Sequence, residues 1–249
     1  MLELNRISAG YGKQTVLDGI SVDFEKGKLT SIIGANGCGK STLLKAILGI
    51  LSLSSGEIFI DGENLLTISR NEIAKKIAYL SQGKNIPDMT VEQMVLHGRF
   101  PYLSYPRRYS SHDREVAIKA MEAVGIAEFA HKPLYSLSGG MRQNAYIAMA
   151  LAQDTEYILL DEPTTYLDIA HQLELMRILR KLADSGKGIV AVMHNLPIAF
   201  DFSDKLTVMS NGKFIAYGTP SEICESHIVE DIFGVKIKQV QKGKYLYEY

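Results

Sequence analysis

The stretch Gly34-Ala35-Asn36-Gly37-Cys38-Gly39-Lys40-Ser41 decides the fold class, because it matches the phosphate-loop pattern G-x4-G-K-[ST]. An apolar run, Leu29–Ile33, precedes the loop and predicts a buried strand. After the loop, apolar residues recur on one helical face, and Gly49 ends that helix. A strand, a Gly-rich loop and a helix in this order are the context that phosphate binding requires.

The chemistry of this loop suits an anion. Glycines let successive backbone N–H groups point inward, and the start of the following helix adds about half a positive charge. We expect Lys40 to reach the β- and γ-phosphates of a nucleotide and the Ser41 hydroxyl to hold Mg²⁺. Cys38 is interpreted as a small filler residue. The residues of this segment predicted to contact the nucleotide are Gly34, Asn36, Gly37, Cys38, Gly39, Lys40, Ser41 and Thr42.

Composition limits the class of protein. The 249 residues include 27 Lys and Arg against 28 Asp and Glu, and this near-neutral balance argues against nucleic-acid binding through phosphates. The longest apolar run, Ala145–Ala152, is far shorter than the roughly 20 residues that a membrane span needs. No secretory signal is expected at residues 1–6, and Cys38 and Cys224 form neither a disulfide framework nor a metal-binding spacing.

Strand-like and helical segments alternate along the chain, which predicts an α/β fold with a largely parallel sheet. An antiparallel edge is expected near the start, from Leu2–Ile7, Ser21–Phe24 and Glu57–Asp61. Helical spacing dominates residues 87–152, at Thr90–Leu96, Ser111–Val124 and Gly140–Ala152. We therefore predict a single domain, with a nucleotide-binding core at 1–86 and 153–249, interrupted by a helical subdomain at 87–152. Lys236–Tyr249 is expected to form a final strand or hairpin.

A second candidate half of the site is Ile158-Leu159-Leu160-Asp161-Glu162-Pro163, an apolar strand that ends in two carboxylates. The carboxyl ends of strands in α/β folds are where ligands bind, so Asp161 should lie beside the phosphate loop of a neighbouring strand. Its expected role is to hold Mg²⁺. Glu162 is suited to orient or deprotonate an attacking water.

A third motif is Leu137-Ser138-Gly139-Gly140-Met141, in which Ser138 stands 23 positions before Asp161. Ser138 is expected to cap the helix that follows. Gly139 and Gly140 would then present backbone N–H groups to a second anion.

These three motifs, in this order, resemble the ATPase subunit of an ATP-binding-cassette (ABC) transporter. The resemblance implies a P-loop NTPase (RecA-like) core that hydrolyses ATP with Mg²⁺. It implies that Tyr11 stacks on adenine, that Gln82 senses Mg²⁺ and the γ-phosphate, and that His194 contacts the γ-phosphate. Leu167-Asp168 resembles the loop that crosses the dimer interface. Departures from the usual pattern occur at Met141, Asn144 and Asn195, and none of them removes a phosphate or metal ligand.

The resemblance also implies partners. Two copies would form a sandwich in which one copy's phosphate loop and the other's Ser138–Gly140 bracket the same ATP. The dimer would bind integral membrane permease subunits on the cytoplasmic face of the membrane, as a peripheral protein. An extracytoplasmic substrate-binding protein would complete the transporter, and no nucleic acid is expected as a partner.

The aromatic and arginine residues between His97 and Tyr109 are interpreted as a docking surface for a permease. A solvated loop and a site for single-stranded nucleic acid are the alternatives. Two segments resemble those of the ATPase subunits of importers for ferric siderophores, haem and vitamin B12: Val95–Gly125 and Thr164–Gln172. Ferric siderophore is the preferred cargo, with haem, cobalamin or a metal oxyanion such as molybdate as alternatives. A soluble non-transport ABC ATPase and a non-hydrolysing nucleotide-binding regulator are more remote.

Overall fold

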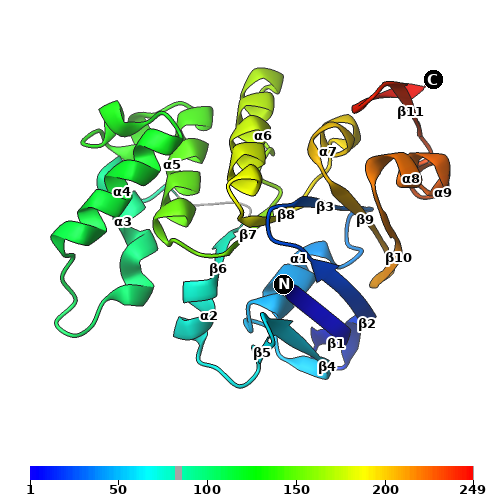
Figure 1. The fold of residues 1–249 in the computed structure, drawn as a ribbon, viewed down its shortest axis with the longest axis horizontal. Coiled ribbons are helices and arrows are strands. Elements are labelled where there is room, and N and C mark those ends of the chain that lie inside the picture. Colours follow the sequence, from blue (N-terminus) through cyan, green and yellow to red (C-terminus); the bar gives the residue numbers. More distant parts are fainter. Residues whose placement is uncertain (82–85, 249) are drawn as a thin grey trace.

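A six-stranded sheet forms the centre of the protein in a computed structural model that describes residues 1–81 and 86–248. Its strand order is β10-β9-β3-β8-β7-β6, and all neighbours run parallel except β10, which is antiparallel to β9. The α/β fold with a mainly parallel sheet is therefore confirmed (Figure 1). The strands are β3 (Leu29–Gly34), β6 (Ile77–Leu80), β7 (Tyr157–Asp161), β8 (Gly188–Val192), β9 (Lys205–Ser210) and β10 (Lys213–Gly218).

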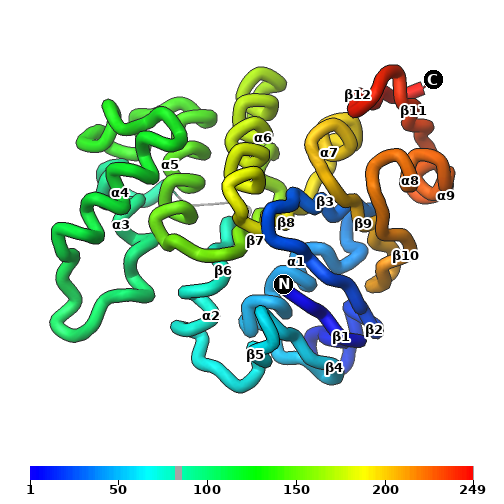
Figure 2. The backbone as a smooth tube through the Cα atoms, in the orientation of Figure 1, coloured from blue at the N-terminus to red at the C-terminus, as the bar shows by residue number. Residues whose placement is uncertain are grey.

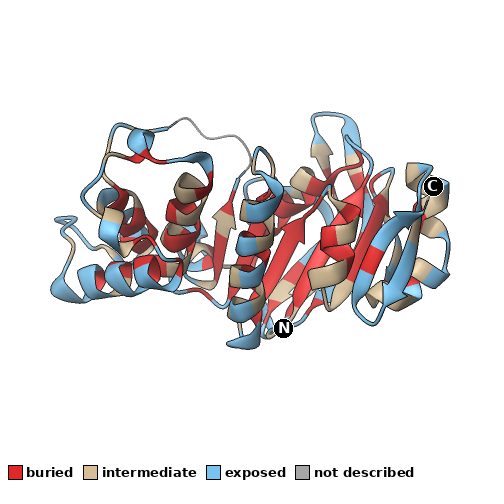
Figure 3. Cartoon of the chain, turned by 90° about the horizontal axis from the view of Figure 1, so that it is seen from above, coloured by how far each residue is buried: buried red, intermediate tan, exposed pale blue. Residues whose placement is uncertain are grey.

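Helices cover both faces of this sheet. Every residue of β3, β7 and β8 is buried, as expected for central parallel strands that are covered on both sides (Figure 3). On one face, α1 (Lys40–Ile47) packs Leu43 into an apolar cluster with Leu159 of β7. On the other face, α6 (Ile169–Asp184) packs Leu175 into a separate cluster with Ile158, and α7 (Leu196–Phe202) joins that cluster.

The expected antiparallel edge is present as a second sheet with the order β2-β1-β4-β5. Its strands are longer than the sequence pattern indicates, because register shifts along β1 interrupt the alternation of buried and exposed residues after Leu4. The elements of this part are β1 (Leu2–Tyr11), β2 (Gln14–Phe24), β4 (Leu53–Ile60), β5 (Glu63–Asn64) and α2 (Arg70–Lys76).

Helices α3, α4 and α5 pack against one another beside the edge strand β6 (Figure 1). The three predicted helices are confirmed with boundaries shifted by one residue, and Thr90, Ser110 and Ser138 cap them with their side chains. The division of the chain at residues 87 and 152 stays a prediction. The elements here are α3 (Val91–Leu96), η1 (His97–Tyr102), α4 (Ser111–Ala123), η2 (Ala127–Phe129), η3 (Leu134–Ser136) and α5 (Gly139–Ala152).

Arg99, one residue of the predicted docking surface, lies in the interior of the protein. Arg99 is only 5% exposed, its Nε donates to Oδ1 of Asp113 at 2.9 Å, and its Nη1 donates to the carbonyl of Ala152 at 2.9 Å. Arg99 therefore ties η1 to α4 and α5, and the prediction that it lies on the surface is wrong. The partner Asp113 stands 14 positions away, too far along the chain for a local pattern to reveal the pair. Tyr105, by contrast, is 96% exposed.

The predicted C-terminal hairpin is confirmed as β11 (Lys236–Gln241) paired with β12 (Lys244–Glu248), after α8 (Pro220–Glu225) and α9 (Ile228–Phe233). Figure 2 shows this hairpin at the opposite end of the molecule from α3 and α4. Among the helices of the described ranges, none combines the length and the apolar character that a membrane span requires.

Candidate active site

Three parallel strands bring the predicted site residues together. β8 hydrogen-bonds to β3 on one side and to β7 on the other. The phosphate loop follows β3, Asp161 ends β7, and His194 follows β8, so all three lie at the carboxyl edge of the sheet. The expectation that β7 is the immediate neighbour of β3 is wrong, because β8 lies between them.

Gly39 is the N-cap residue of α1. Its backbone is left-handed (φ 112°), a conformation that residues other than glycine rarely adopt. Gly39 gives α1 no side-chain cap, so the first N–H groups of this helix are left for an anion. Lys40 is buried, and its ammonium group donates to the carbonyls of Gly34 at 2.8 Å and Ala35 at 2.9 Å. Cys38 is buried within the loop, as expected of a filler residue.

A cavity of about 580 Å³ opens over this loop. It combines residues from the loop and α1 with Glu162 and His194, which are more than 100 positions away along the chain. Thr165, which no sequence motif marks as a site residue, also lines the cavity. The lining residues are Asn36, Gly37, Gly39, Lys40, Ser41, Thr42, Glu162, Thr165 and His194.

Ser41 and Asp161 offer oxygen ligands at the edge of this cavity. The Ser41 hydroxyl donates to Oδ1 of Asp161 at 3.0 Å, which joins α1 to β7. Burial raises the pKa of the Asp161 carboxyl above its ordinary value, and the Ser41 hydrogen bond partly opposes that shift. Within the described ranges, no Lys, Arg or His forms an ion pair with this buried carboxylate. A hydroxyl and a buried carboxylate fit Mg²⁺, which prefers oxygen ligands.

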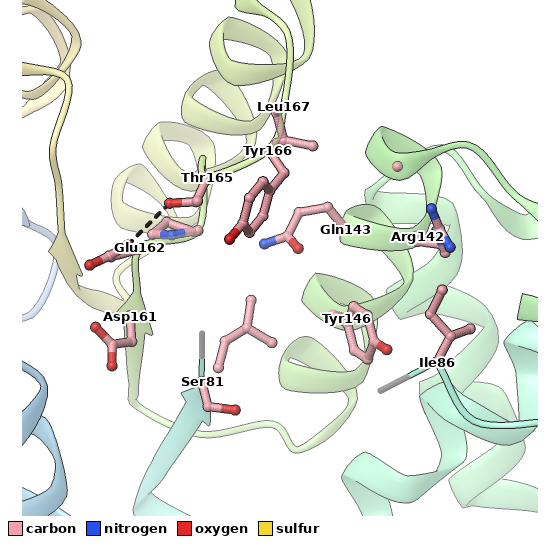
Figure 4. A pocket seen from close by; sticks show the side chains of 13 residues that line it. Ser81, Ile86, Arg142, Gln143, Tyr146, Asp161, Glu162, Thr165, Tyr166 and Leu167 are labelled. Atoms are coloured by element: carbon pink, nitrogen blue, oxygen red, sulfur yellow. Dashed lines mark hydrogen bonds between the residues drawn. The ribbon is translucent and has the colours of Figure 1, made fainter. Parts of the chain in front are cut away.

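Glu162 lies between His194 and Thr165. Its Oε1 contacts Nε2 of His194. Its Oε2 accepts a hydrogen bond from the Thr165 hydroxyl at 3.2 Å, which Figure 4 shows as a dashed line. The backbone of Glu162 is left-handed (φ 52°), an uncommon conformation for a non-glycine residue that recurs at functional sites. These contacts hold the carboxylate at the wall of the phosphate cavity, where a general base or a water-orienting group can act.

The other predicted site residues lie outside this cavity. Tyr11 ends β1 with half of its surface exposed, and Ser138–Gly140 begin α5. The expected cap is present, because the Ser138 hydroxyl accepts from the N–H of Met141 at 3.3 Å. Gly139 lines a second cavity of about 300 Å³ between β7 and α5, to which Glu162 also contributes (Figure 4). Gln82 lies outside the described residues.

Gly140 is in close contact with α6, and no local sequence pattern indicates this contact. A Cβ atom on Gly140 would lie 2.1 Å from Cδ2 of His171, so only glycine fits here without a shift. His171 is itself held by Asp168, whose Oδ2 lies 2.8 Å from Nδ1 of the imidazole. The start of α5 and the Leu167-Asp168 loop are therefore packed together within one chain.

We expect Gly140→Ala to lower the free energy of unfolding by about 1–3 kcal/mol, because the added methyl group must displace the His171 ring from Asp168. Urea unfolding measures this change. Gly139→Ala is the matched control, since a Cβ at that position meets no atom within 4 Å. Adding His171→Ala to Gly140→Ala should restore much of the loss. Equal stability of Gly140→Ala and wild type would show that the contact is not restrictive.

Comparison with known proteins identifies the family of this chain. The family model described as ABC transporter matches residues 17–165. The petrobactin import ATP-binding protein FpuD of Bacillus anthracis is 40% identical over 93% of this chain and 86% of its own length. The ferric enterobactin transport ATP-binding protein FepC of Escherichia coli is also 40% identical, over the same shares of the two chains.

Solved structures with more than 25% sequence identity share the fold of this chain. A chain of a transporter assigned to the metal-chelate ABC type, in an inward-facing conformation, has a TM-score of 0.85 and 28% identity, and covers 100% of this chain and 97% of its own. The ATP-binding cassette MJ0796, dimeric in a post-hydrolysis state with ADP and Pi, has a TM-score of 0.75 and 27% identity. That match covers 88% of this chain and 99% of the other.

Proposed function

We infer that this chain, which belongs to the ABC transporter family, is the ATP-hydrolysing motor subunit of an importer for ferric siderophores. As an ATP-binding subunit of that family it is an ATPase. The observation that carries the residue assignments is the meeting of β3, β7 and β8, which places Lys40, Glu162 and His194 around one cavity.

Each residue of the cavity then has a role in hydrolysis. The loop N–H groups and Lys40 bind the phosphates, and Glu162 orients or deprotonates the attacking water. His194 lies against Glu162, where it contacts the γ-phosphate and holds that carboxylate in place. Ser41 and Asp161 hold Mg²⁺, which when bound neutralises charge on the phosphates. Tyr11 stacks on adenine, and Gln82 is assigned to Mg²⁺ and the γ-phosphate from the family pattern alone.

A second copy of this chain completes the site. The phosphate cavity is lined by residues that follow β3, β7 and β8 at the carboxyl edge of the sheet, and Ser138–Gly140 of the same chain do not line it. In the sandwich that we propose, these three residues come from the second copy and present the start of its α5 to the γ-phosphate. The similar cassette MJ0796, which is dimeric with ADP and Pi bound, supports a dimer.

The permease is proposed to bind to the helical part of the chain, on the cytoplasmic face of the membrane. A groove of about 710 Å³ runs between α3, η1 and the start of α4, and it offers both charged and aromatic side chains to a cytoplasmic helix. An extracytoplasmic binding protein would deliver the cargo to that permease. The groove is lined by Asp88, Met89, Thr90, Glu92, Gln93, Leu96, His97, Tyr109, Arg114 and His131.

Reconstitution tests this function. We expect the chain to hydrolyse ATP in proteoliposomes that contain its cognate permease, and ⁵⁵Fe-labelled siderophore to enter them only when ATP is supplied. Parallel uptake assays with labelled haem, cobalamin and molybdate compare the alternative cargoes. No hydrolysis with or without the permease would contradict the motor function and favour a regulator. ATP-dependent uptake of haem, cobalamin or molybdate in place of the siderophore would contradict only the assignment of the cargo.

A further inference from the structure

We propose that Tyr79 is a positioning residue for the metal site, in which its hydroxyl fixes one carboxylate oxygen of Asp161 while Ser41 fixes the other. The proposal rests on the proposed function, because it assumes that Asp161 holds Mg²⁺. Tyr79 does not touch the nucleotide or the metal in this assignment. It acts through the carboxylate.

The sheet register places Tyr79 next to Asp161. β6 is the edge strand and pairs with β7, with Tyr79 opposite Leu159. Because side chains alternate between the two faces of a sheet, Asp161 shares a face with Leu159 and with Tyr79. Diagonal neighbours of this kind lie within reach of an aromatic side chain. The same face is covered by α1, which carries Ser41, since Leu159 and Leu43 belong to one apolar cluster.

The two oxygens of the carboxylate are therefore held from two elements. Ser41 Oγ donates to Oδ1 at 3.0 Å from α1, and Tyr79 Oη donates to Oδ2 at 3.4 Å from β6. A phenol is protonated at neutral pH and can donate its only O–H to an ionised carboxylate. With both oxygens held, rotation of the carboxylate about its χ2 angle is restricted.

Restricted rotation matters because metal ligands depend on the groups that orient them. Loss of such a partner typically weakens metal affinity by about 10- to 100-fold. The Tyr79 ring is packed against the apolar cluster beneath α1, so phenylalanine can keep this packing and remove only the hydroxyl. The effect of Tyr79→Phe should therefore appear in metal binding rather than in folding.

The test uses Mn²⁺ as the probe, titrated into the full-length protein with ATP and followed by electron paramagnetic resonance. We expect Tyr79→Phe to weaken Mn²⁺ binding by about tenfold or more. The Mg²⁺ concentration for half-maximal ATPase activity should rise by a similar factor, while the rate at saturating Mg²⁺ and the ATP affinity in EDTA stay near wild type. Unchanged Mn²⁺ affinity in Tyr79→Phe would overturn the proposal.

Two further variants make the result specific. Tyr157→Phe is the matched control, because Tyr157 is a buried tyrosine of β7 whose hydroxyl donates to the Phe24 carbonyl at 2.9 Å. It should lower stability and leave Mn²⁺ binding unchanged. Asp161→Asn should abolish tight Mn²⁺ binding. If Asp161→Asn binds Mn²⁺ like wild type, the metal site itself fails, whereas a wild-type result for Tyr79→Phe alone overturns only the role of Tyr79.

Discussion

Lys40→Ala should lower ATP affinity by about 10- to 100-fold, because a charge-assisted hydrogen bond contributes about 1.5–3 kcal/mol. Hydrolysis should fall further, by about 100- to 1,000-fold, since the ammonium group opposes charge that develops on the phosphates. In the structure this group is bound by the carbonyls of Gly34 and Ala35, within the loop that would hold the phosphates. Fluorescent-nucleotide titration and a steady-state phosphate-release assay measure the two effects.

The matched control for this variant is Lys181→Ala, which removes an exposed lysine of α6 and should leave both quantities unchanged. Thermal unfolding of both variants separates loss of binding from loss of folding. If Lys40→Ala folds normally and keeps wild-type ATP affinity and turnover, the assignment of the loop as a phosphate site is wrong.

Glu162→Gln should retain ATP binding and lose turnover by about 100- to 10,000-fold, the usual contribution of a general acid or base. The amide has the shape of the carboxylate and can keep the contacts to His194 and Thr165, but it cannot accept a proton from water. With hydrolysis blocked, ATP should hold two copies together. Size-exclusion chromatography with light scattering should then show a dimer in ATP and a monomer without nucleotide.

Glu174→Gln is the control here, because Glu174 is an exposed carboxylate of α6 away from the cavity. It should hydrolyse ATP at the wild-type rate and show no ATP-trapped dimer. Wild-type turnover in Glu162→Gln would remove Glu162 from its proposed role. Loss of turnover without an ATP-dependent dimer would contradict the sandwich instead.

Much of the core was predictable because its signals are local. The run Leu29–Ile33, the loop and the apolar face after it lie within about 20 residues, and they form β3 and α1 as expected. The strand order was not predictable in the same way. No local pattern indicates that β8, the later strand in the chain, lies between β3 and β7, so the prediction that β3 and β7 are neighbours is wrong.

Residues whose role depends on a distant partner were missed or misjudged. Arg99 has the charge of a surface residue, yet its pairing with Asp113 and the Ala152 carbonyl buries it. Tyr79 and His171 carry no motif, and only the sheet register and the contact between α5 and α6 bring them to the site. Thr165 offers a weak local signal, as a hydroxyl three positions after Glu162 in the same turn.

The position of β8 between β3 and β7 also limits how this protein can move. Two rows of backbone hydrogen bonds fix the distance from the phosphate loop to the carboxylates, so these groups behave as one preassembled block. Changing their spacing would require breaking the centre of the sheet. Regulation of turnover is therefore expected from elements outside strands β3, β8 and β7, such as α5, which packs beside the edge strand β6. The rate of ATP hydrolysis is then expected to depend on how often an element such as α5 reaches a set of catalytic groups whose spacing is already fixed.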